Sequence, residues 1–212
     1  MIAYNKCGHT TIVNTFLTPP GESIERGAPQ AYRPAIRVSN EEAATVRTYR
    51  GSPEAAQEWP EPKVTITFFR NPLARALSAY QHFIVRTLRE SFINLGFRAD
   101  MNFSAFCLHL NNVDLNADNH LKPQCVGFQE VYAGGEVYGG QLEQLYTTWP
   151  LLVEQYGLDC TTEVAHFNAA AYNLETLTGI RREMFQKLYA DDYALWEAAA
   201  FETREAISSV SH

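Results

Sequence analysis

The chain of 212 residues lacks any long apolar run, although 46% of its residues are hydrophobic. A membrane-spanning helix needs about 18–20 consecutive apolar residues, and no window of the sequence approaches that length. The charged and apolar regions of a signal peptide are also missing, and Lys6 interrupts the first apolar stretch. We therefore predict a protein without a membrane span and expect it to be cytoplasmic.

Cysteine is scarce and follows no ligand spacing. The four cysteines are Cys7, Cys107, Cys125 and Cys160, and they form no C-x-x-C pair and no zinc-type Cys/His pattern. Scattered reduced thiols are the expectation for such spacing in a cytoplasmic protein. The sequence predicts no metal site.

Basic residues are too few for a nucleic-acid-binding protein. The chain has 24 acidic and 17 basic residues, which leaves a net charge of −7. Binding to nucleic acid depends on clustered Lys and Arg that displace counterions from phosphates, so nucleic acid is not expected as a partner. The length and the ordinary composition suit one α/β domain with a hydrophobic core.

Periodicity and chain breakers predict alternating strands and helices. Residues 1–4 and Val64–Phe69 are predicted as buried strands, the second one in a parallel sheet. Residues 125–131 are expected to form another strand, residues 18–40 to be mostly loop, and the glycine pairs at 134–135 and 139–140 to form a turn. Helices are predicted over 10–17, 41–48, 72–89, 103–110, 141–156 (bent at Pro150) and 180–201 (broken near Asp191 and Asp192).

The first strand leads into a segment suited to an anion. Lys6 supplies a positive charge, and Gly8 lets a ligand approach the backbone at the start of a helix. The hydroxyls of Thr10 and Thr11 can donate to anionic oxygens or cap the helix. The pattern G-x-x-x-x-G-K-[ST] is absent, so the ATP-type phosphate loop is not expected.

A second candidate anion site follows the strand Val64–Phe69. Arg70 leaves the strand where Asn71 and Pro72 begin a helix. Arg75, Ser78 and His82 recur at helical spacing on one face of that helix. An arginine and a serine suit a phosphate monoester, whereas a solvated pair of arginines is the alternative for an amphipathic helix. Two anion-binding turns after two strands together suggest a ligand with two separated phosphates.

Four segments, in order, resemble motifs of the sulfotransferases that use 3′-phosphoadenosine 5′-phosphosulfate (PAPS), in their carbohydrate (family 2) branch. Together they span residues 4–193, nearly the whole chain. Asn71 stands where the family has an acidic residue, and residues 18–60 contain no histidine, which argues against the heparan-type mechanism. The matching segments are Lys6-x-Gly8-x-Thr10-Thr11, Arg70-Asn71-Pro72-Leu73-x-Arg75-x-x-Ser78-x-Tyr80, Asp118-x-His120-x-x-Pro123-Gln124 and Lys187-Leu188-Tyr189-x-x-Asp192-Tyr193.

The resemblance implies a single P-loop-like α/β domain over 1–212, with a central, mostly parallel sheet flanked by helices. It implies transfer of the sulfuryl group of PAPS to a hydroxyl of a carbohydrate or glycoconjugate, with 3′,5′-adenosine bisphosphate as the product and no metal. The residues Lys6, Cys7, Gly8, His9, Thr10 and Thr11 would hold the 5′-phosphosulfate. Arg70 and Ser78 would hold the 3′-phosphate, with Arg75 as a weaker member that alternatively ties the helix to the fold.

Catalytic roles follow from the same resemblance. Lys6 is the candidate cation beside the leaving oxygen. His120 is the candidate base, with Asp118 to orient it, and His9 is the rival base within the anion loop. A structural role for the Asp118–His120 pair remains the alternative. Two other function classes also stay open: a P-loop-like nucleotide kinase and a non-catalytic nucleotide-binding module.

Overall fold

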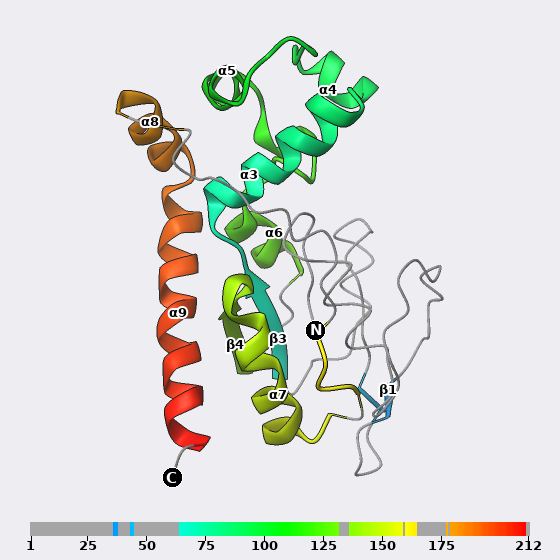
Figure 1. Ribbon diagram of the computed structural model, residues 1–212, viewed down its shortest axis with the longest axis vertical. Coiled ribbons are helices and arrows are strands. Elements are labelled where there is room, and N and C mark those ends of the chain that lie inside the picture. Colours follow the sequence, from blue (N-terminus) through cyan, green and yellow to red (C-terminus); the bar gives the residue numbers. More distant parts are fainter. Residues whose placement is uncertain are drawn as a thin grey trace.

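The computed structural model describes residues 36–37, 43–44, 64–131, 136–158, 160–164, 177 and 179–210, in which helices and strands are mixed (Figure 1). The strands β3 (Val64–Phe69) and β4 (Glu136–Gln141) pair in parallel, with Val64 opposite Glu136 and Phe69 opposite Gln141. The strands β1 (Ile36–Arg37) and β2 (Ala43–Ala44) form a short antiparallel pair. The helix predicted over 41–48 is therefore wrong at Ala43 and Ala44. The parallel pairing of β3 agrees with the sequence prediction.

The turn from β3 into α3 (Pro72–Tyr80) follows from local sequence. The Asn71 side-chain oxygen accepts hydrogen bonds from the backbone N–H groups of Leu73 (3.0 Å) and Ala74 (3.2 Å). Pro72 occupies the first helical position, where a backbone N–H is not needed. Both features were predicted from the sequence, and they fix where the strand ends and the helix begins.

The helix that starts at Pro72 changes its winding after Tyr80. Gln81–Arg86 forms a π-helical segment, and Thr87 is extended, so the predicted continuation to residue 89 is wrong at its end. Wider winding changes which neighbours share a face, and the adjacent side chains Phe83 and Ile84 are both buried. His82, between Gln81 and Phe83, is exposed.

An aromatic core holds the helices at one end of the molecule together. The helices α3, α4 (Glu90–Asn94), α5 (Phe103–His109) and α8 (Ile180–Leu188) surround it (Figure 1). A short 3₁₀ turn, Leu110–Asn112, extends α5. The core phenylalanines are almost fully buried, at about 1.5–3 kcal/mol of hydrophobic stabilisation each; they are Phe83, Phe92, Phe97, Phe103, Phe106 and Phe185.

A second core lies around the strand pair. Ile66 and Phe68 of β3 pack with Tyr138 of β4 and with Trp149 of α7 (Leu145–Tyr156). Leu142–Gln144 forms a 3₁₀ turn before α7, and Pro150 lies inside α7. The predicted helix over 141–156 is thus confirmed in its main part, although Gln141 itself ends β4.

The glycine pair at 139–140 lies in β4 and is buried, so the predicted turn there is wrong. A Cβ atom on Gly140 would lie 2.7 Å from Cε1 of Phe68, closer than real Cβ contacts. Glycine at this position therefore makes room for the ring of the neighbouring strand. Gly134 and Gly135 lie outside the described residues.

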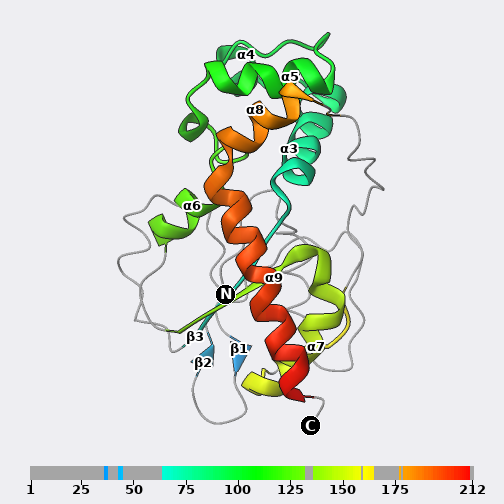
Figure 2. The same cartoon turned by 90° about the vertical axis from the view of Figure 1, so that its left-hand side faces the viewer.

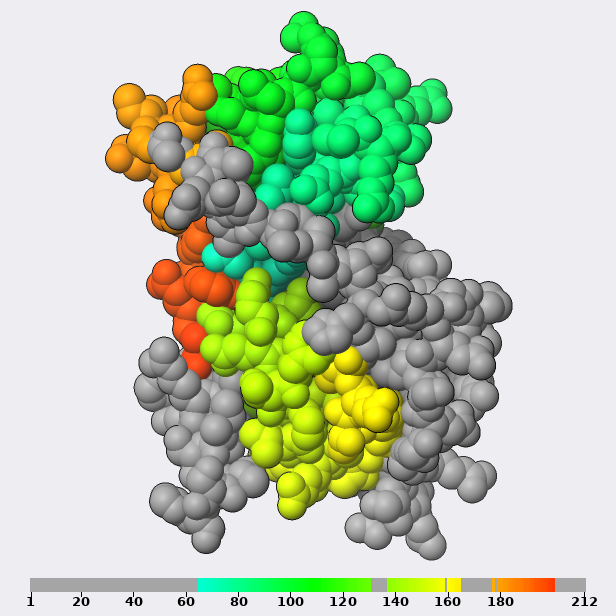
Figure 3. Space-filling view, viewed as in Figure 1, coloured from blue at the N-terminus to red at the C-terminus, as the bar shows by residue number. Residues whose placement is uncertain are grey.

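The helix α9 (Ala190–Val210) connects both cores. It follows α8 after a break at Tyr189, close to the predicted break. Viewed from the side, α9 runs in front of the strand pair and continues up to the helical end (Figure 2). Figure 3 shows the molecular surface from the same side as Figure 1. On this face, the segment that follows β3 lies in the upper part, and β4 and α7 lie in the lower part. Among the described helices, none is both long and apolar enough to cross a membrane.

The segment predicted as a strand over 125–131 is the helix α6 (Gln124–Val131). Its first N–H groups are satisfied by the carboxylate of Asp192, which is 68 residues from Gln124 in the sequence. No residue next to α6 in sequence signals this cap, and Val126 and Phe128 are residue types that are enriched in strands. The contact with Asp192, far away in the sequence, thus stabilises the start of α6 as a helix.

Candidate functional site

The described part of the candidate site is built around the carboxyl end of β3. Arg70, the residue after the strand, is half-buried. The backbone N–H of Asn71 donates to Oε1 of Glu143 at 2.9 Å, and Oε2 of Glu143 accepts from the Trp196 ring nitrogen at 3.0 Å. Glu143 thus joins the start of α3 to α9.

Gln124 forms two hydrogen bonds to the backbone of Arg70. Its Oε1 accepts from the N–H of Arg70, and its Nε2 donates to the carbonyl of Arg70, both at 2.9 Å. Gln124 is 1% exposed. The side-chain amide thus makes the hydrogen bonds that a neighbouring strand would make, one residue beyond the end of the β3–β4 ladder.

Asp192 holds Gln124 from the other side. Its Oδ2 accepts from the backbone N–H of Gln124 at 2.8 Å, and its Oδ1 accepts from that of Cys125 at 2.9 Å. Asp192 is 1% exposed, and a carboxylate this deeply buried depends on such hydrogen bonds. One turn earlier, the hydroxyl of Tyr189 donates to the carbonyl of Leu121 at 2.9 Å.

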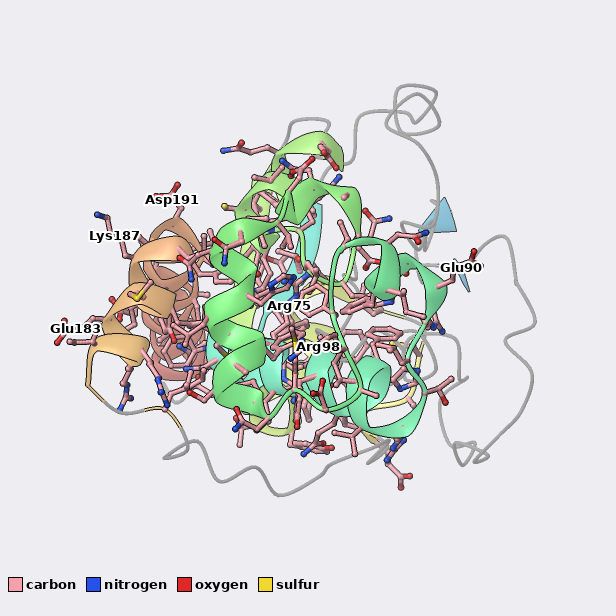
Figure 4. All side chains as sticks on the ribbon, turned by 90° about the horizontal axis from the view of Figure 1, so that it is seen from above. Arg75, Glu90, Arg98, Glu183, Lys187 and Asp191 are labelled. Carbon is pink, nitrogen blue, oxygen red and sulfur yellow. The ribbon has the colours of Figure 1, made fainter. Side chains whose placement is uncertain are left out.

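Arg75 lies inside the molecule and contacts the segment before α6. It is 4% exposed, and its Nη2 donates to the carbonyl of Asn119 at 3.2 Å. In Figure 4 it lies in the centre, whereas Glu183, Lys187 and Asp191 project outward from α8 and α9. Burial raises the pKa of Tyr189, and the charge of Arg75 opposes part of that rise. These contacts favour the fold-supporting role of Arg75 that the sequence left open.

His120 and Asp118 are in direct contact. Nδ1 of His120 lies 2.7 Å from Oδ1 of Asp118, which also accepts from the backbone N–H of His120 at 2.8 Å. Burial alone would raise the pKa of Asp118, but hydrogen bonds from His120 and Ser91 outweigh it, so the pKa lies below its ordinary value. Asp118 is therefore a carboxylate at neutral pH, and it accepts a hydrogen bond from Nδ1 of His120.

Phe83, from the π-helical segment, forms the apolar support of this histidine. The ring centres of Phe83 and His120 are 4.4 Å apart, and the guanidinium carbon of Arg89 lies 4.6 Å from the centre of the same Phe83 ring. The His120 side chain is 22% exposed. It is thus held on two sides, by a carboxylate and by an aromatic ring, and still reaches the surface.

The candidate residues fall into two groups. The structure describes Arg70, Arg75, Ser78 and His120, and Ser78 is half-buried on α3. The predicted anion loop lies outside the described residues; it comprises Lys6, Cys7, Gly8, His9, Thr10 and Thr11. No geometry relates the two groups, so their predicted joint role stays a prediction.

Three contacts were missed by the sequence reasoning. Gln124 was part of a matched segment but received no role, Asp192 was considered beyond the motif match only for the predicted helix break, and Glu143 was not considered. The only sequence signal for these contacts was a polar side chain next to an apolar stretch. Nε2 of His109 donates a hydrogen bond to the carbonyl of Leu95 at 2.9 Å, and the His109 ring packs on Phe97.

None of the described cysteines is in a disulfide bond: Cys107, Cys125 and Cys160. Burial and, next, the charge of Asp192 raise the pKa of Cys125 to about 12, so this thiol stays protonated at neutral pH. Within the same part of the chain, no three His, Cys, Asp or Glu side chains group as metal ligands.

No protein-family profile, curated protein or solved structure matches the chain.

Proposed function

We propose that this protein is a PAPS-dependent sulfotransferase that transfers a sulfuryl group to a hydroxyl of a carbohydrate or glycoconjugate. One observation carries the proposal: three of the four segments that resemble the family's motifs meet at the end of β3. They contact one another through Gln124 on the backbone of Arg70 and Asp192 on the N–H of Gln124. Segments that match by chance have no reason to be joined by hydrogen bonds through two buried side chains, Gln124 and Asp192.

The proposal also concerns the fold. The β3–β4 pair would belong to the central parallel sheet of a P-loop-like α/β domain spanning 1–212. What supports it is a parallel strand pair with helical connections and with α9 against it. Ligands in open α/β sheets bind outside the carboxyl ends of the strands, and Arg70 stands at such an end.

The residues at the end of β3 fit a phosphate held by side chains. The first N–H groups of α3 are already bound by Asn71, and that of Asn71 by Glu143. The donors for a 3′-phosphate would therefore be the Arg70 guanidinium and the Ser78 hydroxyl. Ser78 lies about 9 Å of helical rise beyond Pro72, so the Arg70 side chain would have to extend along α3 for the two groups to hold one phosphate.

Bound PAPS would supply the sulfuryl group and a leaving bisphosphate. Nδ1 of His120 is held by Asp118, so Nε2 is the nitrogen that would accept the proton of the acceptor hydroxyl. Phe83 and Asp118 keep the ring in place for that transfer. Lys6, as the cation at the leaving oxygen, and His9, as the rival base, stay predictions on residues outside the described part of the chain.

The first test is calorimetric titration with 3′,5′-adenosine bisphosphate, ADP and ATP in the same buffer without metal. The proposal expects clear preference for the bisphosphate, and Arg70→Ala should lose that preference. Arg98→Ala is the matched control, because Arg98 is exposed and pairs only locally with Asp100. Equal or stronger binding of ADP or ATP would favour a kinase instead, and no binding at all would favour an interaction module.

The second test is transfer from PAPS to a panel of sugar acceptors. His120→Ala should abolish transfer while the bisphosphate still binds. If transfer continues at the wild-type rate, His120 is not the base, and His9→Ala becomes the next variant.

A further inference from the structure

Arg70 is the first residue beyond the ladder that joins β3 to β4, which ends at Phe69 opposite Gln141. Its backbone is nevertheless bound on both polar groups, at 2.9 Å each, by the side chain of Gln124. A single amide that both donates to and accepts from one residue restrains the orientation of that residue's backbone. The direction in which the Arg70 side chain leaves the strand end therefore depends on Gln124.

Gln124 is itself anchored from outside its own segment. The buried carboxylate of Asp192 binds the backbone N–H groups of Gln124 and Cys125, and a negative charge at a helix N-terminus is favourable. Gln124 and Asp192 are each 1% exposed. A continuous chain of hydrogen bonds thus runs from the first turn of α9 through the buried side chains of Asp192 and Gln124 to the backbone of Arg70.

We propose that Gln124 is a positioning residue that sets selectivity for the nucleotide's 3′-phosphate by holding Arg70 in its binding orientation. This inference rests on the proposed sulfotransferase function. A guanidinium held in place before the ligand arrives loses less conformational freedom on binding than one on a loose backbone. Gln124 thus acts through Arg70, without contacting the nucleotide.

The experiment measures the affinities of the wild-type protein and of Gln124→Met for 3′,5′-adenosine bisphosphate and for 5′-AMP. Methionine keeps the length of the side chain but makes neither hydrogen bond to Arg70. The ratio of the two affinities reports on the 3′-phosphate alone. We expect this ratio to fall by on the order of 10-fold, as is typical when a supporting residue of a binding group is lost, with 5′-AMP affinity little changed.

Gln141→Met is the matched control. Gln141 is also a buried glutamine, 6% exposed, and its Nε2 donates to the carbonyl of Trp196 at 2.9 Å. Its substitution removes a comparable hydrogen bond near the strand end, but the partner is α9 and not the backbone of Arg70. It should lower stability without changing the affinity ratio.

A double-mutant cycle tests the route of the effect. In an Arg70→Met background, Gln124→Met should not lower the affinity ratio further, because the group through which it acts is gone. An additive second loss would overturn the positioning role. If Gln124→Met does not fold, Gln124→Asn replaces it, since this variant keeps a polar amide but is one methylene too short to hold both backbone groups of Arg70 as Gln124 does.

The outcomes separate the two proposals. A wild-type protein that does not prefer the bisphosphate overturns the proposed function, and the inference with it. A wild-type protein that prefers the bisphosphate, together with a Gln124 variant that keeps the full preference, overturns the inference alone. A reduced ratio in the Gln124 variant and an unchanged ratio in the Gln141 variant support both.

Discussion

Replacing Asp192 by alanine should lower stability far more than replacing an exposed carboxylate in the first turn of a helix would. The substitution removes the partner of two backbone N–H groups, those of Gln124 and Cys125, at a carboxylate that is 1% exposed. Each buried donor left without a partner costs about 1–3 kcal/mol. Loss of an ordinary helix cap costs about 0.5–2 kcal/mol. We therefore expect Asp192→Ala to lower the free energy of unfolding by about 3 kcal/mol.

Urea denaturation followed by far-ultraviolet circular dichroism measures this loss. With a urea dependence of about 2 kcal/mol per molar, the midpoint should fall by about 1.5 M. Asp191→Ala is the matched control: the neighbouring carboxylate in the same helical turn is exposed and points outward (Figure 4). It contributes only the helix-dipole interaction, about 0.3–1 kcal/mol.

Asp192→Asn refines the measurement. The asparagine oxygen can accept from one N–H, but its amide group faces the other, so the loss of stability should lie between those of the two alanine variants. If Asp192→Ala were no more destabilising than Asp191→Ala, the view that Asp192 fixes the start of α6 would be refuted. The support that Gln124 receives from α9 would fall with it.

Three further perturbations have definite expected outcomes. Thr148→Val should raise the free energy of unfolding by about 1 kcal/mol, because the Thr148 hydroxyl is fully buried and has no hydrogen-bond partner among the described residues. An unchanged or lower thermal midpoint would contradict this. Gly140→Ala should lower the free energy of unfolding by about 1–3 kcal/mol, because the new methyl group would overlap the Phe68 ring. A variant as stable as the wild type in urea would show that β3 and β4 can move apart without loss of stability. Asp118→Asn should be less stable than the wild type above the ordinary carboxyl pKa of about 3.9. This difference in stability should disappear as the pH falls through the lowered folded-state pKa of Asp118. Urea denaturation at neutral and at acid pH measures it, and a difference that grows in acid would contradict the prediction.

Where structure depended on neighbours in sequence, it could be predicted from the sequence. The strand Val64–Phe69, the Asn71 cap and Pro72 at the first helical position are all local signals, and they appear in the structure at those positions. The hydrogen bond between Asp118 and His120, two residues apart, was also anticipated from the chain.

Where the local structure depended on residues far away in the sequence, the sequence prediction was wrong or made no statement. α6 has a strand-like composition but begins at a carboxylate supplied by α9. Gly139 and Gly140 resemble a turn, yet both lie in β4, where the ring of Phe68 leaves no room for a side chain at Gly140. The role of the Gln124 amide becomes visible only in the folded protein, where it hydrogen-bonds to the backbone of Arg70. Single residues read along the chain carry no information about such pairings.

The position of α9 has a consequence for biosynthesis. The strand end at Arg70 leaves the ribosome early, but Asp192 and Trp196, which hold Gln124 and Glu143, follow much later. Until they emerge, the N–H groups at the start of α6 have no carboxylate to bind, and Glu143 lacks its indole donor. We expect a nascent chain that stops before α9 to be open to proteases at the 118–131 segment. The end of β3 would then become ordered only after α9 has been synthesised and packs against β3, β4 and α6.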